Sequence, residues 1–192
     1  MINQFISHLN KFITLNSEEE FFLCQELKIK EYRKGQIILR EGQVSKSFYF
    51  NLSGFVRLFY IKDSGEKTAY FYPKGFFISA YESFVKQVPS KLNLQVTEKT
   101  ILVDISIAAS QKLLEFSPKF EAIARIAMED ELINHQKIIH ALLTLSPEER
   151  YYNLMSENPE IFQKVPQHQI ASYIGVQPES LSRIKKRYLE KS

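Results

Sequence analysis

Polar and basic side chains near the carboxyl end are the residues of this chain whose types and spacing best suit a chemical task. Glutamine, glutamate, serine and arginine can hydrogen-bond to base edges, while lysine and arginine can neutralise phosphates. The candidate DNA-contacting residues are Gln169, Gln177, Glu179, Ser180, Ser182, Arg183, Lys185, Lys186 and Arg187. The net charge of the whole chain is only +3, and a short basic run is often just a solvated helix end. The run therefore matters only if it belongs to a DNA-docking motif.

Two short helices with a sharp turn between them are expected to position these side chains. Ile170 and Ile174 place two apolar groups on one face of the first helix, and Ala171 is small where the helices approach each other. Gly175 permits the left-handed backbone that ends a helix abruptly. Val176 then fills the inside of the turn. These features predict the first helix and turn of a helix-turn-helix.

The second helix of this pair is predicted to begin at Pro178 and to cover residues 178–189. Proline suits the first helical position, because its missing N–H has no partner there in any helix. Leu181 and Ile184 face inward, which leaves the polar and basic side chains on the outer face. An ordinary helical hairpin is the alternative, but it would not require the alanine, the glycine, the proline and a basic outer face together. We therefore predict DNA binding.

Enzymatic and metal chemistry find little support in the sequence. The single cysteine, Cys24, excludes a disulfide framework, and we expect it to be a small buried hydrophobe rather than an oxidant sensor. The histidines lie outside the region of predicted strands, at His8, His135, His140 and His168. An imidazole metal site within that region is therefore excluded, and no nucleophile stands with a base. We predict no enzyme, no catalytic residue, no metal and no cofactor.

The amino-terminal part of the chain changes from helical to strand-like texture. Residues 2–27 are predicted to be helical, with a capping-box-like start at Ser17 before three glutamates. Aromatic and β-branched residues then gather in short runs at 36–39, 47–52, 55–61, 68–72 and 101–105. Turn residues separate these runs. Several short strands at regular spacing predict a β-barrel or a sandwich.

A long helix is predicted to follow, starting at Pro118 and reaching residue 143. Its apolar stripe recurs with a period of 3.5 residues, at Met128, Leu132, His135, Ile139 and Leu142. That is the spacing of two helices packed along their length, so the stripe predicts a homodimer. A single amphipathic helix lying on its own domain is the alternative. Additional isoleucines beside the stripe favour a helix that contacts both its own domain and a partner.

These elements predict an α+β chain of three parts. A capping box with proline at its first helical position, Ser146 to Glu149, begins a new helix, and the domain boundary is placed near residues 143–145. Residues 1–117 form a sensor with amino-terminal helices, residues 118–143 the dimerisation helix, and residues 144–192 the DNA-binding domain.

Taken together, the chain resembles the cAMP receptor protein/FNR (Crp/Fnr) family of transcription regulators over nearly its whole length. The segments 53–58, 63–66 and 73–77 are similar to the strand–turn pattern of that family. The resemblance implies a cyclic-nucleotide-binding-like β-barrel (double-stranded β-helix or jelly roll) and a winged-helix-like unit. It also implies DNA, a second copy of the chain and RNA polymerase as partners. Glu179 and Arg183 fall on base-contacting positions of the family, and Pro178 on a third, where cAMP receptor protein has an arginine.

Two departures from the family pattern are expected to alter its function. Nucleotide-binding members hold the ribose with a Gly-Glu-Leu triplet and the cyclic phosphate with an arginine, where this chain has Ser79-Ala80-Tyr81 and Ser90-Lys91. Neither alanine nor serine replaces a charged partner, although Glu82 and Lys91 lie close by as substitutes. We therefore predict no response to cAMP and an unidentified small-molecule effector. The wing after the second helix is also expected to be truncated, since the sequence stops at Ser192.

Two alternatives to this interpretation remain open. One is a cyclic-nucleotide-responsive regulator with an altered pocket, and the other is a protein-interaction scaffold that does not bind DNA. The first fifteen residues do not form a secretory signal, and no stretch is long and apolar enough to cross a membrane. A cytoplasmic protein is expected.

Overall fold

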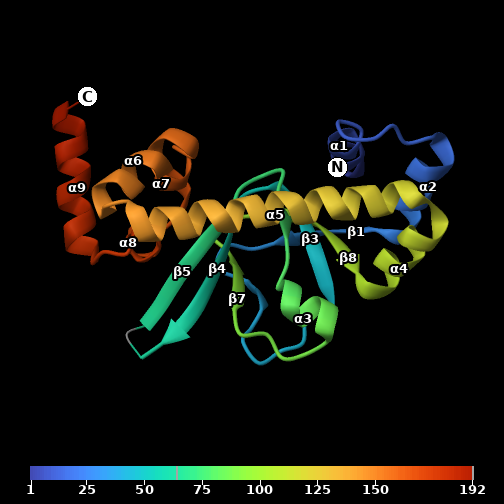
Figure 1. Ribbon diagram of the computed structural model, residues 1–192, viewed down its shortest axis with the longest axis horizontal. Helices are drawn as coiled ribbons and strands as arrows, with labels where there is room; N and C mark the ends of the chain where they lie inside the picture. Colours follow the sequence, from blue (N-terminus) through green and yellow to red (C-terminus); the bar gives the residue numbers. More distant parts are fainter. Residues whose placement is uncertain (64, 192) are drawn as a thin grey trace.

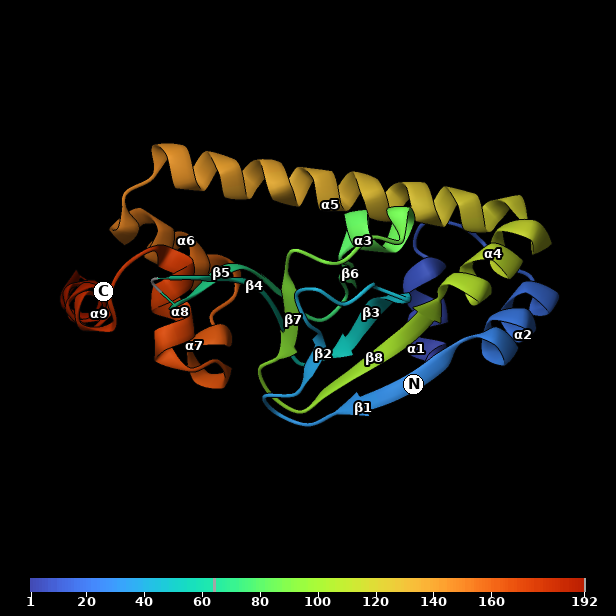
Figure 2. The same ribbon diagram turned by 90° about the horizontal axis from the view of Figure 1, so that it is seen from below.

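Two antiparallel four-stranded sheets form the amino-terminal half of the protein, in a computed structural model that describes residues 1–63 and 65–191 (Figures 1 and 2). The first sheet has the order β1 (Lys28–Tyr32), β8 (Thr100–Ser106), β3 (Ser47–Ser53) and β6 (Phe77–Ile78). The second has the order β2 (Ile37–Leu39), β7 (Asn93–Val96), β4 (Val56–Lys62) and β5 (Gly65–Tyr72). Alternate residues of both sheets, such as Leu58, Leu94 and Leu102, meet in a buried core between them.

The sheets are not closed into a barrel, so the expectation of a barrel is wrong and the sandwich is the observed arrangement. β6 has two residues and β2 has three, and such short strands cannot carry a ladder from one sheet to the other. The expected apolar runs all became strands. β1 and β7 were missed because polar residues interrupt them, and β6 because it has only two residues. The helix α3 (Tyr81–Lys86) was missed as well. Ser64 of the predicted turn at 63–66 lies outside the described residues.

Three helices cover the outer face of the first sheet: α1 (Ile2–Leu9), α2 (Ser17–Glu26) and α4 (Ile107–Phe116). The predicted helical stretch 2–27 is therefore two helices with a loop between them. The capping box of α2 is formed by Asn16 and Glu19, one residue earlier than predicted. Cys24 is exposed on α2 rather than buried, so that expectation is also wrong.

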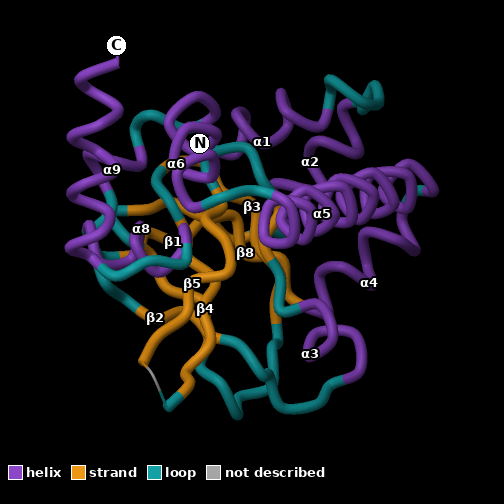
Figure 3. Tube along the Cα trace, turned by 60° about the vertical axis from the view of Figure 1, so that its left-hand side comes forward, coloured by secondary structure: helices purple, strands orange, loops and turns teal. Residues whose placement is uncertain are grey.

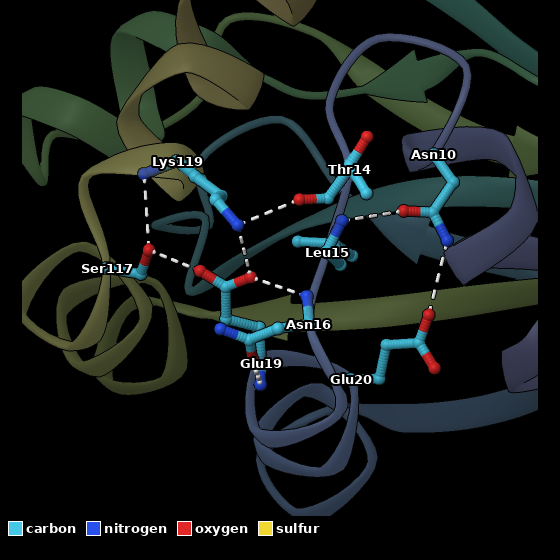
Figure 4. A network of polar contacts seen from close by, with 8 residues as sticks. All are labelled: Asn10, Thr14, Leu15, Asn16, Glu19, Glu20, Ser117 and Lys119. Atoms are coloured by element: carbon cyan, nitrogen blue, oxygen red, sulfur yellow. Dashed lines mark hydrogen bonds and ion pairs between the residues drawn. The ribbon is translucent and has the colours of Figure 1, made fainter.

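Glu19 joins the amino-terminal segment to the start of the long helix (Figure 4). Its buried carboxylate accepts hydrogen bonds from the Asn16 N–H at 2.8 Å, the Ser117 hydroxyl at 2.7 Å and the Lys119 ammonium at 2.8 Å. Lys119 also donates to the Thr14 carbonyl at 2.8 Å. The hydrogen bond from Lys119, followed by that from Asn16, lowers the pKa of Glu19 to about 2. The carboxylate therefore stays charged under ordinary conditions and fixes this corner of the fold.

The long helix α5 (Pro118–Thr144) crosses the sandwich and ends beside the carboxyl-terminal helices (Figure 2). The Ser117 side chain caps it and Pro118 begins it, as predicted. The carboxyl-terminal part contains α6 (Pro147–Glu157), α7 (Ile161–Lys164), α8 (Gln167–Ile174) and α9 (Pro178–Lys191). The predicted capping box of Ser146 and Glu149 is present. None of the described helices combines the length and apolar character that crossing a membrane requires.

Candidate functional site

A three-residue turn, residues 175–177, joins α8 to α9, and both helices lie in the carboxyl-terminal part of the molecule (Figure 3). Gly175 ends α8 in the left-handed region, at φ 83°, and its N–H donates to the Ala171 carbonyl at 3.0 Å. The Val176 N–H donates to the same carbonyl at 2.9 Å. A side chain at residue 175 would be strained by this backbone and would also meet the Arg150 guanidinium at 3.3 Å. The glycine therefore allows the tight turn that brings α9 back across α8.

The two helices bury their apolar faces in one core, shared with α6 and α7. Ile170, Ala171 and Ile174 of α8 are fully buried, as are Leu181 and Ile184 of α9. The opposite face of the turn and α9 is solvent-exposed, with Ser180 half-buried, and carries Gln177, Glu179, Ser180, Ser182, Arg183, Lys185, Lys186 and Arg187. The predicted set of DNA-contacting side chains therefore shares one outer surface, with one exception.

That exception is Gln169, whose side chain is only 8% exposed and lies among the buried residues of α8. Its Oε1 atom has no hydrogen-bond partner within the described part of the chain. Some members of the outer surface are engaged within the protein. Arg187 is 3.5 Å from the Glu148 carboxylate, and the Ser182 hydroxyl donates to the Pro178 carbonyl at 3.3 Å.

Arg150 of α6 connects the end of the long helix to the end of α8. Its Nε donates to the Ile174 carbonyl at 2.8 Å and one terminal nitrogen donates to the Ala141 carbonyl at 3.5 Å. Both carbonyls belong to the last turn of a helix, where a cation is electrostatically favourable. The sequence analysis did not single out Arg150, because a lone arginine on a capped helix gives no signal of this bridging role.

The carboxyl-terminal helices pack on the outer face of the second sheet, where Phe55 and Phe71 belong to the core of the helix-turn-helix. The rings of Phe71 and Tyr173 are 5.5 Å apart. Lys164 of α7 lies 3.8 Å from the Glu98 carboxylate and over the ring of Phe55. The carboxyl-terminal helices are therefore attached to the sandwich by direct packing as well as by α5. These contacts join residues far apart in the chain, which no local pattern reveals.

The residues predicted as a ligand pocket, Ser79, Ala80, Tyr81, Glu82, Ser90 and Lys91, lie around α3. Ala80 is buried ahead of the first turn, and Tyr81 is exposed. Buried Ser90 donates to the Leu92 carbonyl at 2.8 Å and accepts from the Leu92 N–H at 3.2 Å. Lys91 pairs with the exposed carboxylate of Glu82 at 3.3 Å.

Within these residues, which we call the cassette, the polar side chains of Ser90, Glu82 and Lys91 have partners in the protein. The hydroxyl of Ser90 is used within its own turn, and Ala80 has no polar side-chain atom. Lys91 lies in a bend rather than on a strand. It points to solvent, where hydrogen bonds from Lys91 and then from Lys86 lower the pKa of Glu82.

Two cavities lie along α5, away from these cassette residues. The smaller, about 320 Å³, is bounded by α1, the loop before β6 and α5, and includes Asp130 and Glu131. Glu131 accepts a hydrogen bond from the Tyr72 hydroxyl at 2.8 Å, and burial raises its pKa. The larger, about 830 Å³, lies between β5, α5 and the carboxyl-terminal helices. Its walls include Tyr70, Lys137 and Tyr173.

The predicted dimer stripe forms an exposed apolar strip along α5. Met128 is 40% exposed, Leu132 60%, Ile139 56% and Leu142 55%. His135 lies among them, with its ring 3.6 Å from the Glu131 carboxylate. The opposite side of the helix faces its own domain, where Phe120 and Ile123 pack on the core under α1 and α4. Within the described residues, no group of histidine, cysteine, aspartate and glutamate side chains is arranged to hold a metal ion.

Comparison with known proteins identifies the class to which this arrangement belongs. Residues 29–115 match the family model of the cyclic nucleotide-binding domain. FixK2 from Bradyrhizobium japonicum superposes with a TM-score of 0.73 at 15% identity, over 86% of this chain and 85% of that protein. The c-di-GMP responsive global regulator CLP from Xanthomonas campestris gives a TM-score of 0.71 at 18% identity, over 92% and 93%.

A regulator from Eubacterium rectale assigned to the Crp/Fnr family gives a TM-score of 0.70 at 18% identity, over 92% of this chain and 85% of that one. A comparison with curated proteins finds no significant match. The chain therefore has the fold of Crp/Fnr regulators, and residues 29–115 are similar to the cyclic nucleotide-binding domain, which confirms the resemblance found in the sequence.

Proposed function

We propose that this protein is a DNA-binding transcription regulator of the Crp/Fnr type, which binds a two-fold symmetric operator as a homodimer. The observation that carries the proposal is the turn at Gly175, which holds α9 with its polar and basic face to solvent. In a helix-turn-helix, such a face enters the major groove. Structural relatives that are regulators support the same function.

Arg183 would be the main base reader, because its guanidinium can make two parallel hydrogen bonds to guanine. Glu179 lies one turn earlier on the same helix and would assist it. Lys185, Lys186 and Arg187 would neutralise phosphates, and Ser180 or Ser182 would hydrogen-bond to them. Gln177, at the turn before α9, would contact the backbone. We leave Gln169 out of this set, because it is buried in the arrangement described above.

A homodimer would form through the exposed strip of α5, since pairing two such strips removes their apolar side chains from water. In this scheme residues 1–117 sense, residues 118–143 dimerise and residues 144–192 read DNA. The two copies of α9 would then face successive major grooves, about one helical turn apart. RNA polymerase is a further partner that a regulator of this class would contact, in the cytoplasm.

The sensor would not respond to cAMP, because the side chains around α3 are used within the protein. A different small molecule would act as effector. The cavities along α5 offer it space, and ligand sites commonly lie between domains. An effector there would bias the position of α5 and so the spacing of the two readers.

Selection from a random DNA pool tests this function. Purified protein should enrich duplexes with two inverted half-sites about ten base pairs apart, and Arg183→Ala should lose that enrichment. A pool that stays random would contradict the proposal and would favour a scaffold function for the same fold.

A further inference from the structure

Ser172 of α8 forms two hydrogen bonds with the edge of the second sheet. Its hydroxyl accepts from the Thr68 N–H at 2.9 Å and donates to the Glu66 carbonyl at 2.9 Å. Among the described residues, β5 is the edge strand of its sheet and pairs with β4 alone, so these two backbone groups point away from the sheet. An added strand would bond the same pair of groups. One hydroxyl replaces that strand, because it donates and accepts at once.

The segment of β5 that holds Ser172 is itself fixed from within the sheet. Arg57 of β4 is 1% exposed, forms an ion pair with the Glu66 carboxylate and donates to the Thr68 hydroxyl at 3.4 Å. Its guanidinium also lies over the ring of Phe59, 4.0 Å from the centroid. Glu66 and Thr68 therefore contact Arg57 through their side chains and Ser172 through their backbone. The guanidinium of Arg57 therefore links the two residues of β5 whose backbone groups bond Ser172.

We propose that Ser172 is a positioning residue that locks the DNA-reading helices onto the sensor sheet and thereby sets the separation of the two copies of α9. This role rests on the proposed function. It also implies a second connection between sensor and reader, through β5 directly, besides the one through α5. Movement of β5 would then reach α8 without any change in the long helix.

The physical reason is the effective concentration of the second reader. Once one copy of α9 has bound its half-site, the other copy binds as an intramolecular partner. The affinity gained in this way depends on a fixed geometry between the two copies of α9. A loosened helix-turn-helix must lose more orientational freedom on binding the second half-site. The loss should therefore appear on a full operator and not on a single half-site.

The test compares Ser172→Ala with the parent protein on two DNA duplexes, one with both half-sites and one with a single half-site. Fluorescence anisotropy should show binding weakened about tenfold on the full operator, which corresponds to about 1.4 kcal/mol, and by less than about twofold on the half-site. Ser172→Thr keeps the hydroxyl and should restore full-operator binding. Ser156→Ala is the matched control, because Ser156 is an exposed serine of α6 in the same domain.

A second measurement needs no DNA. Amide hydrogen exchange at Thr68 should be faster in Ser172→Ala than in the parent and in Ser156→Ala, because the Thr68 N–H loses its acceptor. Equal weakening on both duplexes would overturn the positioning role, since it would place Ser172 in the folding of the helix-turn-helix. Unchanged exchange at Thr68 would overturn the contact itself. Parent protein that binds no DNA but shows the exchange difference would instead overturn the proposed function.

Discussion

The nucleotide cassette around α3 and the helix-turn-helix differ in how their polar side chains are used. Around α3, Ser90 is bonded within its turn and Lys91 pairs with Glu82. On α9, Glu179 and Arg183 are exposed on a surface whose other side is a closed apolar core. Both regions keep the framework of the same fold family. The two regions therefore differ in the polar groups that remain exposed to a partner and not in the framework that carries them.

The largest expected effect concerns whether two copies of α9, joined in a homodimer, bind the operator together. Replacing both Leu132 and Ile139 with aspartate should convert the dimer to monomers, because unpaired charges in a desolvated seam are strongly unfavourable. Operator binding should then fall to the level of a single half-site. Analytical ultracentrifugation at micromolar concentration measures the change. A double variant that stays dimeric would remove α5 as the interface.

The cassette should fail to bind cAMP or cGMP usefully. Two charged hydrogen-bond partners are missing, each worth about 1.5–3 kcal/mol, so the dissociation constant should be raised roughly a hundred- to ten-thousand-fold relative to a nucleotide-binding member. Isothermal titration calorimetry with cAMP should therefore be flat at micromolar concentrations. Saturable cAMP binding near micromolar would contradict this prediction. In that event Lys91→Ala should abolish the cAMP binding.

Removing the charge of Glu19 should destabilise the amino-terminal part of the protein. Glu19→Gln should lower the free energy of unfolding by about 1.5–3 kcal/mol, since an amide cannot replace a carboxylate that accepts three hydrogen bonds. The lowered pKa of Glu19 adds stability that is fully present above pH 4.5 and is lost as the pH falls toward 2. Urea unfolding across that range should show a steeper loss in the parent than in the variant.

Arg183→Ala should weaken binding to the selected operator by about 1–3 kcal/mol and relax the preference at one base position. Anisotropy titrations on operators substituted at each position measure this effect. Unchanged affinity would show that Arg183 does not read bases.

Lys186→Ala is expected to have the smallest effect. It should weaken binding to all sequences alike and reduce the slope of log affinity against log salt by about one. A sequence-dependent loss would instead make Lys186 a base reader.

Local signals in the sequence located the ends of several helices, for identifiable reasons, although α3, α4 and α7 were not predicted. Proline at the first helical position and the capping box at Ser146 located the starts of α5 and α6, and Gly175 located the end of α8. Each signal depends on hydrogen bonds within a few residues, so sequence alone contains it. The shift of the first capping box to Asn16 has the same origin, since both asparagine and serine can cap a helix.

Contacts between distant segments could not be predicted in this way. Whether strands close into a barrel depends on pairing between their edges, and the short strands β2 and β6 gave no pattern from which to judge it. The burial of Gln169 also follows from packing between elements and not from its own helix. Arg150, Arg57 and Ser172 act across the fold, so their roles were visible only once the elements had been placed.

Because α5 is long, a small tilt at one end of the helix would displace its other end by several ångströms. Its 27 residues span about 40 Å at 1.5 Å per residue. A tilt of about 5° at the Pro118 end would move the Thr144 end by roughly 3.5 Å, about a tenth of the one-turn distance between half-sites. The network of Glu19 and Lys119 lies at the Pro118 end, about which α5 would tilt. Arg150 joins the other end of α5 to α8. Small rearrangements near the amino terminus would therefore be magnified before they reach α8 and α9.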